Sequence, residues 1–367
     1  MSEVQETVLE IDLNALQHNF EYLKSTLKKE TKILAVVKAF GYGTSASKVA
    51  KRLEKLKVDC FAVAYAKEGV SLREAGIITP IIVLHPQVIN FKSIIQHDLE
   101  PNIYSKRVLE AFIDKTEAVN KKDYPIHIKF NTGLNRLGFS ENDIDAILSK
   151  IKGRTSVKIC SVFSHLAASE DLNEKAFSEN QISLFKRITN QFSLKLGYQP
   201  ILHMTNTSGI LNYPEAHFDM VRIGIGLYGF ANDKKHTKKL KNVATLKSVI
   251  SQIHSIEKGK SVGYNRAFKA DKTIRTATIP IGHADGIHRA FGNGNGYVLI
   301  HGKKASIVGN VCMDMIMVNI TKIDCQEGDE VVIFDSQEMV NDLTKKINSI
   351  SYELLTAISQ RIKRIVK

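Results

Sequence analysis

The chain has 367 residues, and its 51 lysine and arginine residues outnumber its 38 aspartate and glutamate residues, which gives a formal net charge of +13. This length exceeds the size at which one hydrophobic core stops growing, so we expect two domains. A positive charge suits nucleic acid, a membrane surface or small anions, but the basic residues are scattered and form no stripe interleaved with aromatic residues, which argues against nucleic acid.

Cysteine spacing and hydropathy exclude further classes of protein. The four cysteines lie far apart without a CxxC pair, so we expect neither a disulfide framework nor a metal site. They are Cys60, Cys160, Cys312 and Cys325. No run approaches the roughly 18 apolar residues that a membrane span needs, and residues 1–6 are acidic without the apolar centre of a signal peptide. We expect a cytoplasmic protein that binds no membrane.

The first two thirds of the chain alternates short apolar runs with helical patterns. The apolar runs predict strands at residues 33–39, 60–65, 80–85, 100–104, 126–131, 157–165, 201–206 and 220–226. Helical patterns lie between most of them, for example at residues 45–56, 104–119, 141–151 and 179–196. Eight strands with helical crossovers predict a closed (β/α)8 barrel of the TIM type. A further strand at residues 8–13 could pair with either domain.

The pattern changes after Phe230, beginning with a charged stretch at residues 231–241. Alternating strands with glycine turns then predict a mainly β domain. These strands cover residues 297–301, 305–308, 315–320 and 330–334, and an amphipathic helix over residues 341–365 closes the chain. The sequence therefore predicts an α/β protein with a barrel domain at residues 1–235 and a mainly β C-terminal domain at residues 236–367.

The first barrel strand leads into Lys38 and the glycine-flanked Tyr42, before Thr44 and Ser45 open an amphipathic helix. This order directs an amine and a phenol towards one pocket. A desolvated lysine amine has a lowered pKa and can form a Schiff base with an aldehyde. The alternative is a lysine that extends from the end of a strand into solvent.

Polar residues also follow later strands, at the rim where barrel enzymes place their reacting groups. Besides Lys38, this rim is expected to carry His165, Asn206, Thr207 and Arg222. Gly224 and Gly226 would let backbone N–H groups approach an anion, although close packing of strands would favour the same glycines. His165 could instead be a hydrogen-bonded core residue, and we expect a structural role for His203.

Residues 35–43 resemble the cofactor-lysine signature of alanine racemases, which are pyridoxal-phosphate enzymes of fold type III. Further matches to that family follow in order at residues 129–138, 163–165, 203–207, 221–225, 262–264, 281–286 and 309–314. They span nearly the whole chain. The resemblance implies an isomerase that interconverts L-alanine and D-alanine with pyridoxal 5′-phosphate, and that supplies D-alanine for peptidoglycan.

The resemblance also implies roles for individual residues. Lys38 would hold the cofactor and act as one proton-transfer base, and Tyr264 would be the second base on the opposite face. The implied cofactor-binding residues are Lys38, Tyr42, His165, Asn206, Thr207, Arg222, Gly224 and Ile225. Arg136 and the Met313 backbone would bind the alanine carboxylate, and Lys129 resembles a lysine that is often carbamylated. The implied assembly is a homodimer in which Tyr264 and Met313 complete the partner's site.

Three residues depart from the family pattern, which leaves phosphate binding and the access channel open. Asn131 stands where the family usually has aspartate, and His283 and Gln360 stand where it commonly has tyrosine. A racemase for serine or lysine would share the same residues. A non-enzymatic pyridoxal-phosphate carrier is a second alternative, but such carriers lack a second domain that bears a base.

Overall fold

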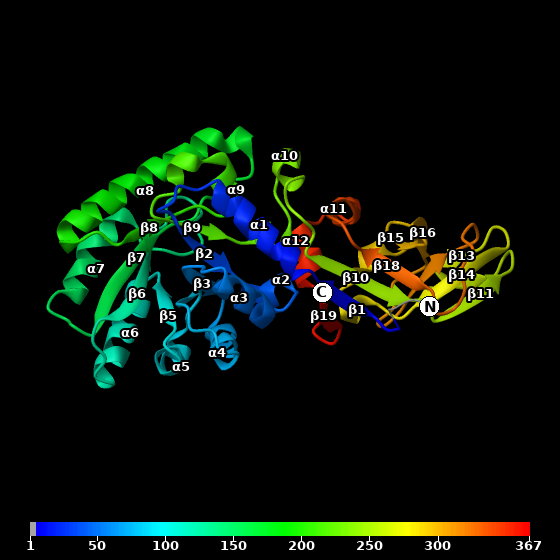
Figure 1. Cartoon of the computed structure of the whole chain (residues 1–367), viewed down its shortest axis with the longest axis horizontal. Helices are drawn as coiled ribbons and strands as arrows, with labels where there is room; N and C mark the ends of the chain where they lie inside the picture. Colours follow the sequence, from blue (N-terminus) through cyan, green and yellow to red (C-terminus); the bar gives the residue numbers. More distant parts are fainter. Residues whose placement is uncertain (1–4) are drawn as a thin grey trace.

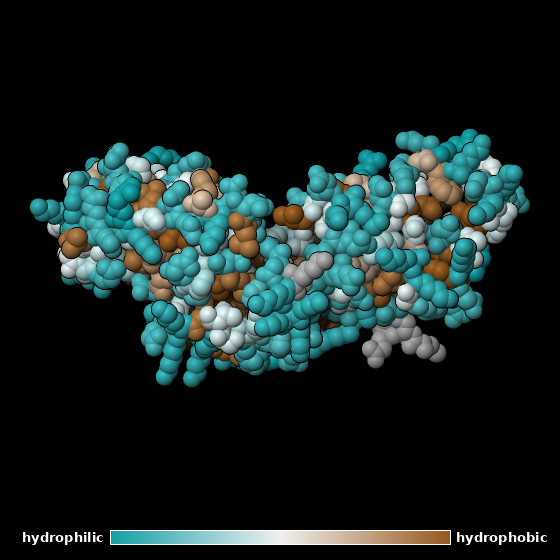
Figure 2. Space-filling model, turned by 90° about the horizontal axis from the view of Figure 1, so that it is seen from above, coloured by the Kyte–Doolittle hydropathy of each residue, from teal (hydrophilic) through white to brown (hydrophobic). Residues whose placement is uncertain are grey.

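The computed structural model describes residues 5–367, apart from the side chain of Lys234. A barrel and a β domain lie next to each other along the long axis of the molecule (Figure 1). The prediction for residues 1–6 concerns a segment whose first four residues lie outside this range. No helix in the described part of the chain is long and apolar enough to cross a membrane. The face in Figure 2 is mostly hydrophilic, with apolar residues scattered over both domains.

Eight parallel strands form the closed barrel that the sequence predicts. They are β2 (Lys32–Val36), β3 (Cys60–Val63), β4 (Ile81–Val83), β5 (Glu100–Ile103), β6 (Tyr124–Lys129), β7 (Val157–Phe163), β8 (Ile201–His203) and β9 (Met220–Ile223). The barrel closes because β9 pairs in parallel with β2, with Met220 opposite Lys32. The strands are buried almost throughout, as expected for a parallel sheet that helices cover.

Helices surround the barrel and connect its strands (Figure 1). They are α1 (Leu13–Ser25), α3 (Ala46–Lys55), α4 (Ala66–Glu74), α5 (Phe91–Gln96), α6 (Lys106–Ala118), α7 (Ile144–Ile151), α8 (Lys175–Leu196) and α9 (Thr207–Asn212). The predicted helix at residues 104–119 begins later, because the Ser105 hydroxyl caps α6 by accepting a hydrogen bond from the Val108 N–H.

The second domain contains a nine-stranded sheet in the order β11-β14-β17-β16-β15-β18-β10-β1-β19. Its later strands are β10 (Ala244–Val249), β11 (Gln252–Ile256), β14 (Ile274–Ile279), β15 (Tyr297–Ile300), β16 (Lys303–Val308), β17 (Ile316–Asn319) and β18 (Glu330–Phe334). The short strands β12 (Ser261–Val262) and β13 (Phe268–Lys269) form a separate pair, and α10 (Lys234–Thr237) lies in the connection from the barrel. The mainly β character of this domain is confirmed.

The first strand, β1 (Val8–Ile11), lies between β10 and β19 (Lys363–Val366). It therefore belongs to the sheet of the second domain, although the barrel follows it in sequence. The boundary between residues 235 and 236 stays a prediction.

The prediction of one closing helix at residues 341–365 is wrong. Two short helices, α11 (Gln337–Lys346) and α12 (Ser351–Thr356), are followed by β19. The helix breaks where Asn348 adopts a left-handed φ of 54° and the Ser349 N–H turns back to the Thr344 carbonyl. The last residues then pair with β1, so tertiary strand pairing overrides their helical periodicity.

Candidate functional site

A cavity of about 460 Å³ opens at the carboxyl ends of the barrel strands. All of the predicted site residues except Tyr264 and Met313 line it. These lining residues are Lys38, Tyr42, Lys129, Arg136, His165, Asn206, Thr207, Arg222, Gly224 and Ile225. The barrel thus brings together side chains that lie almost 190 residues apart in sequence.

Lys38 begins a short, irregular helical turn, α2 (Lys38–Tyr42), two residues after the end of β2. Ala39 and Phe40 adopt left-handed backbone conformations with φ of 52° and 56°, which are unfavourable for residues with a Cβ. The Glu68 carboxylate stabilises this turn, because it accepts hydrogen bonds from the Ala39 N–H at 2.6 Å and the Ala64 N–H at 2.7 Å. Glu68 is not among the residues predicted from the sequence, because no motif distinguishes it from other helical glutamates.

Four cations line the cavity, and no aspartate or glutamate is among its described lining residues. They are Lys38, Lys129, Arg136 and Arg222. Burial lowers the pKa of Lys38, and the nearby Arg136 lowers it further, against the opposing effect of Glu68. Burial and the charges of Arg222, Arg136 and Lys38 lower the pKa of Lys129 to about 8. The cavity is therefore suited to an anionic ligand.

Arg222 is buried and directs both Nη atoms to neutral acceptors. Nη1 donates to His203 Nδ1 at 2.9 Å. Nη2 donates to His165 Nδ1 at 2.9 Å and to the Ser164 and Met204 carbonyls. Among the described residues no hydrogen bond engages Nε, so that N–H remains available to a ligand. Burial, followed by the charge of Arg136, lowers the pKa of Arg222 to about 9, so the guanidinium stays protonated at neutral pH.

The structure gives His203 a more specific role than the general structural one expected. Its ring stacks on Phe163 with centroids 4.7 Å apart and an interplanar angle of 8°, while its Nδ1 accepts from Arg222. Burial and the charge of Arg222 hold the pKa of both His165 and His203 well below the usual range. Both rings are therefore neutral acceptors for the guanidinium at neutral pH. The sequence places His203 inside the predicted strand at residues 201–206, whereas the observed strand β8 ends at His203.

Another part of the cavity wall is formed by hydroxyl groups and by backbone that lies close to them. Thr207 Oγ1 accepts hydrogen bonds from the Gly224 N–H at 3.2 Å and the Gly226 N–H at 3.3 Å. A Cβ on Gly224 would lie 2.6 Å from the Tyr42 hydroxyl, so glycine is needed there. The Asn206 side chain caps α9 by accepting from the Gly209 N–H, which holds Thr207 in position.

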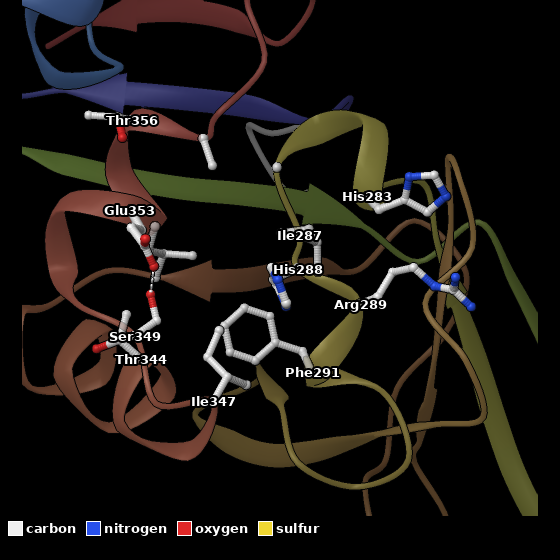
Figure 3. A pocket seen from close by; sticks show the side chains of 13 residues that line it. His283, Ile287, His288, Arg289, Phe291, Thr344, Ile347, Ser349, Glu353 and Thr356 are labelled. Atoms are coloured by element: carbon white, nitrogen blue, oxygen red, sulfur yellow. Dashed lines mark hydrogen bonds between the residues drawn. The ribbon is translucent and has the colours of Figure 1, made fainter.

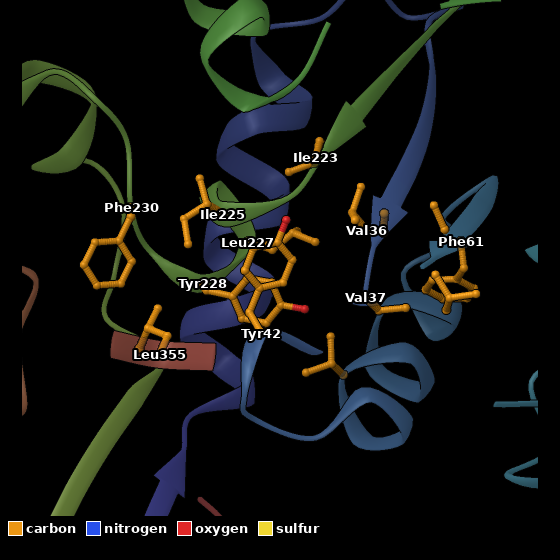
Figure 4. Packing of buried hydrophobic residues seen from close by; sticks show 14 of the residues in the cluster. Val36, Val37, Tyr42, Phe61, Ile223, Ile225, Leu227, Tyr228, Phe230 and Leu355 are labelled. Atoms are coloured by element: carbon orange, nitrogen blue, oxygen red, sulfur yellow. The ribbon is translucent and has the colours of Figure 1, made fainter. Parts of the chain in front are cut away.

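Tyr42 is held in place by aromatic packing. Its ring stacks on Tyr228 with centroids 4.6 Å apart, next to Ile225 and to Leu355 from α12 (Figure 4). Tyr352, also from α12, lies tilted against Tyr42 and lines the cavity. Burial raises the pKa of Tyr352 to about 12, so its phenol stays protonated and can donate. Tyr352 is not among the residues predicted from the sequence, because its approach to Tyr42 depends on how α12 packs against the barrel.

Tyr264 and Met313 lie in the second domain and do not line the cavity of their own chain. Their side chains are 70% and 59% exposed, so both are accessible at the surface of the single chain. The Asn310 side chain donates to the Tyr264 carbonyl at 3.3 Å, so the two loops are neighbours. No hydrogen bond from the Met313 N–H lies within residues 5–367.

A second cavity of about 660 Å³ lies in the C-terminal domain (Figure 3). Phe291 and Ile287 form part of its wall, the Glu353 carboxylate contacts the Ser349 hydroxyl, and His283 lies at one side. Within the described residues no three histidine, cysteine, aspartate or glutamate side chains are grouped to hold a metal. This cavity lacks the cluster of cations that distinguishes the barrel cavity.

Comparison with known proteins identifies the family. Residues 11–232 match the model for the alanine racemase N-terminal domain, and residues 243–366 match that for the alanine racemase C-terminal domain. The chain belongs to the alanine racemase family. Members of this family are isomerases that depend on pyridoxal phosphate. The family and fold predicted from the motifs are confirmed.

Individual relatives match over nearly their full length. The chain is 34% identical to alanine racemase 1 of Caldanaerobacter subterraneus, covering 99% of this chain and 95% of that protein. A structure of the alanine racemase of Clostridium difficile 630 is 31% identical with a TM-score of 0.92, covering 100% and 97% of the two chains. The alanine racemase of Bartonella henselae with covalently bound pyridoxal phosphate is 30% identical, with a TM-score of 0.88 over 99% of each chain.

Proposed function

We propose that this protein is an alanine racemase, which interconverts L-alanine and D-alanine with pyridoxal 5′-phosphate and supplies D-alanine for peptidoglycan. The observation that carries the proposal is the barrel cavity, in which a lysine with a lowered pKa stands among further cations and without a carboxylate. Membership in the alanine racemase family indicates alanine as the substrate. The second domain argues against a non-enzymatic carrier.

The residues present fit the phosphate, the pyridine nitrogen and the aldehyde of the cofactor. Tyr42, Thr207 and the backbone of Gly224 and Ile225 would hold the phosphate, since a side chain on Gly224 would fill this space. The free Nε–H of Arg222 would meet the pyridine nitrogen, and the Lys38 amine would hold the aldehyde carbon. When bound, the cofactor acidifies the Cα–H bond of the amino acid by drawing its electrons into the ring.

Arg222 retains its proton, which influences the outcome of the reaction. A guanidinium that accepts no proton and does not readily lose one would donate a hydrogen bond to the pyridine nitrogen without transferring its proton. Arg222 would thereby discourage side reactions such as transamination. His165 and His203 keep the guanidinium oriented by accepting from its two Nη atoms.

Racemisation needs two bases, because a single base returns the proton to the face from which it came. Lys38 would serve one face of the substrate and Tyr264 the other, with Tyr264 supplied by the second subunit of a homodimer. The exposure of Tyr264 and Met313 in the single chain supports this assembly. The Met313 N–H, which meets no acceptor in the described part of the chain, would bind the alanine carboxylate together with Arg136.

Lys129 would adjust the charge of the site by carbamylation. With its pKa lowered to about 8, an appreciable fraction of the amine is neutral and can attack carbon dioxide. A nitrogen–carbon bond forms, one proton leaves for solvent, and the lysine becomes an anion that can orient Arg136. Asn131, where the family usually has aspartate, instead stabilises the adjacent turn by accepting from the Gly133 and Asn135 N–H groups.

Incubation of the purified protein with pyridoxal phosphate and L-alanine in deuterated water tests the proposal. We expect deuterium at Cα in both L- and D-alanine, and a final ratio close to one. Parallel incubations with L-serine and L-lysine measure substrate breadth. Absence of D-alanine, or exchange confined to the L-enantiomer, would contradict a two-base alanine racemase.

A further inference from the structure

A continuous chain of hydrogen bonds leads from Arg222 through the barrel interior to Glu100. Arg222 Nη1 contacts His203 Nδ1 at 2.9 Å, and His203 Nε2 contacts Ser161 Oγ at 3.1 Å. Ser161 Oγ contacts His127 Nδ1 at 2.6 Å, and His127 Nε2 contacts Glu100 Oε2 at 2.8 Å. The adjacent strands β9, β8, β7, β6 and β5 each supply one of these residues.

The two ends of this chain determine its direction. A guanidinium can only donate, so His203 must present a bare Nδ1 to Arg222 and carry its proton on Nε2. An ionised carboxylate can only accept, so His127 must carry its proton on Nε2, facing Glu100. The single hydroxyl proton of Ser161 then completes the series by donating to His127 while the oxygen accepts from His203. With one proton on each imidazole, reversing any one link would place two donors or two acceptors opposite each other.

The burial of these residues gives the direction an energetic consequence. Arg222, His203, Ser161 and His127 are all buried, and a buried polar group without a partner costs about 1–3 kcal/mol. Within residues 5–367 no carboxylate hydrogen-bonds to Arg222, since its acceptors there are two imidazoles and two carbonyls. Glu100 is therefore the anionic group to which the buried guanidinium is connected.

We propose that Glu100, His127, Ser161 and His203 form a one-way hydrogen-bond relay that holds Arg222 in position, with Glu100 as its anionic end. The four are positioning residues, because none of them needs to touch the substrate. This inference rests on the proposed function for the role of Arg222. The direction of the hydrogen bonds does not depend on it, so the two can fail separately.

The protonation of the imidazoles tests the relay directly. Nitrogen-15 NMR of the full chain, labelled at its 12 histidines, distinguishes a protonated from a bare ring nitrogen, and His127→Gln and His203→Gln assign the signals. In both the cofactor-free and the loaded protein we expect His127 and His203 to carry a proton on Nε2 and none on Nδ1. A proton on Nδ1 of either ring would overturn the relay, whatever the protein catalyses.

Interrupting the relay tests its purpose. Ser161→Ala removes the middle link of the relay. We expect kcat to fall about 10-fold with KM for alanine unchanged, because losing a residue that orients a functional group through a hydrogen bond typically has an effect of this size. The Nε2 signal of His203 should shift because it loses its acceptor. Glu100→Gln keeps an acceptor oxygen but removes the charge, so the histidine protonation should persist while kcat falls. Wild-type kcat in both variants would overturn the positioning role.

Tyr124→Phe provides a matched control. The Tyr124 hydroxyl is buried in the same part of the barrel and donates to the Leu99 and Ile94 carbonyls, outside the relay. We expect a lowered melting temperature with kcat within about 2-fold of wild type. A loss of kcat as large as that of Ser161→Ala would mean that general loosening of the barrel explains both effects, and it would overturn the proposal.

Discussion

Lys38 and Lys129 are two amines in one cavity whose pKa values are both lowered, but the surroundings separate their roles. Lys38 stands on a strained turn beside Glu68, whose charge partly opposes the lowering. Lys129 has no carboxylate among the causes of its shift, and lies against the Phe163 ring at 5.8 Å. Lys38 would be suited to covalent chemistry. The positive charge of Lys129 lowers the stability of the cofactor-free fold, because burial disfavours it.

Lys129→Met should stabilise the cofactor-free protein in bicarbonate-free buffer. The unfolded chain binds more protons than the folded chain between about pH 8 and pH 10.5, so wild-type stability rises with pH across that window. At pH 7 we expect the variant to gain about 3 kcal/mol in the free energy of unfolding by urea, although it should lose activity. The gain should fade towards pH 10.5, and a constant gain over this range would contradict the lowered pKa.

At the scale of elements, the C-terminal segment contributes to the wall of the barrel cavity. α12 supplies Tyr352 to the cavity and places the Leu355 carbonyl directly over Gly43, at the end of the turn that carries Lys38. The same turn is fastened to the last strand, since the Arg364 guanidinium donates to the Gly43 and Thr44 carbonyls. The position of Lys38 therefore depends on residues more than 300 positions later.

Gly43→Ala tests this coupling, with Gly76→Ala as its control. Both glycines have a left-handed φ, 81° and 87°, but a Cβ at Gly43 would lie 1.9 Å from the Leu355 oxygen, whereas a Cβ at Gly76 meets nothing within 4 Å. We expect a cost of about 1 kcal/mol for Gly76→Ala from backbone strain alone. Gly43→Ala should cost about 3 kcal/mol or more and weaken cofactor binding. Equal melting temperatures for the two variants would show that α12 does not restrain the turn.

At the scale of the whole molecule, the two domains carry complementary parts of one proposed site. The barrel holds the cation-lined cavity, and the second domain presents Tyr264 and Met313 at its surface. A two-fold homodimer would use both surfaces twice, because each subunit gives its loops to the other's cavity.

Mixing two inactive variants tests this arrangement. Lys38→Ala lacks one base and Tyr264→Phe lacks the other, so each homodimer should be nearly inactive in racemisation. After unfolding and refolding together, half of the dimers are mixed, and each mixed dimer contains one site with both bases. We expect recovery of about a quarter of wild-type activity. If bases came from the same chain, every site would lack one of them and no activity would return.

The sequence by itself determined the barrel, the mainly β second domain, the family and ten of the residues that line the cavity. Hydrophobic periodicity reports which residues are buried, and the order of the motifs reports which strand ends carry polar groups; both are local properties. Lys38 and Arg222 reach the same rim because each follows or ends a strand of one closed barrel.

Only the tertiary structure decided how the C-terminal segment folds and which buried groups support Arg222. Residues 363–366 have a helical pattern but become a strand because the edge of β1 offers hydrogen bonds there. Glu100, His127, Ser161 and His203 are separated by about 30 to 40 residues, and nothing in their local sequence indicates that they bond to one another. Hydrogen-bond partners across strands depend on register and side-chain direction, which are settled when the barrel closes.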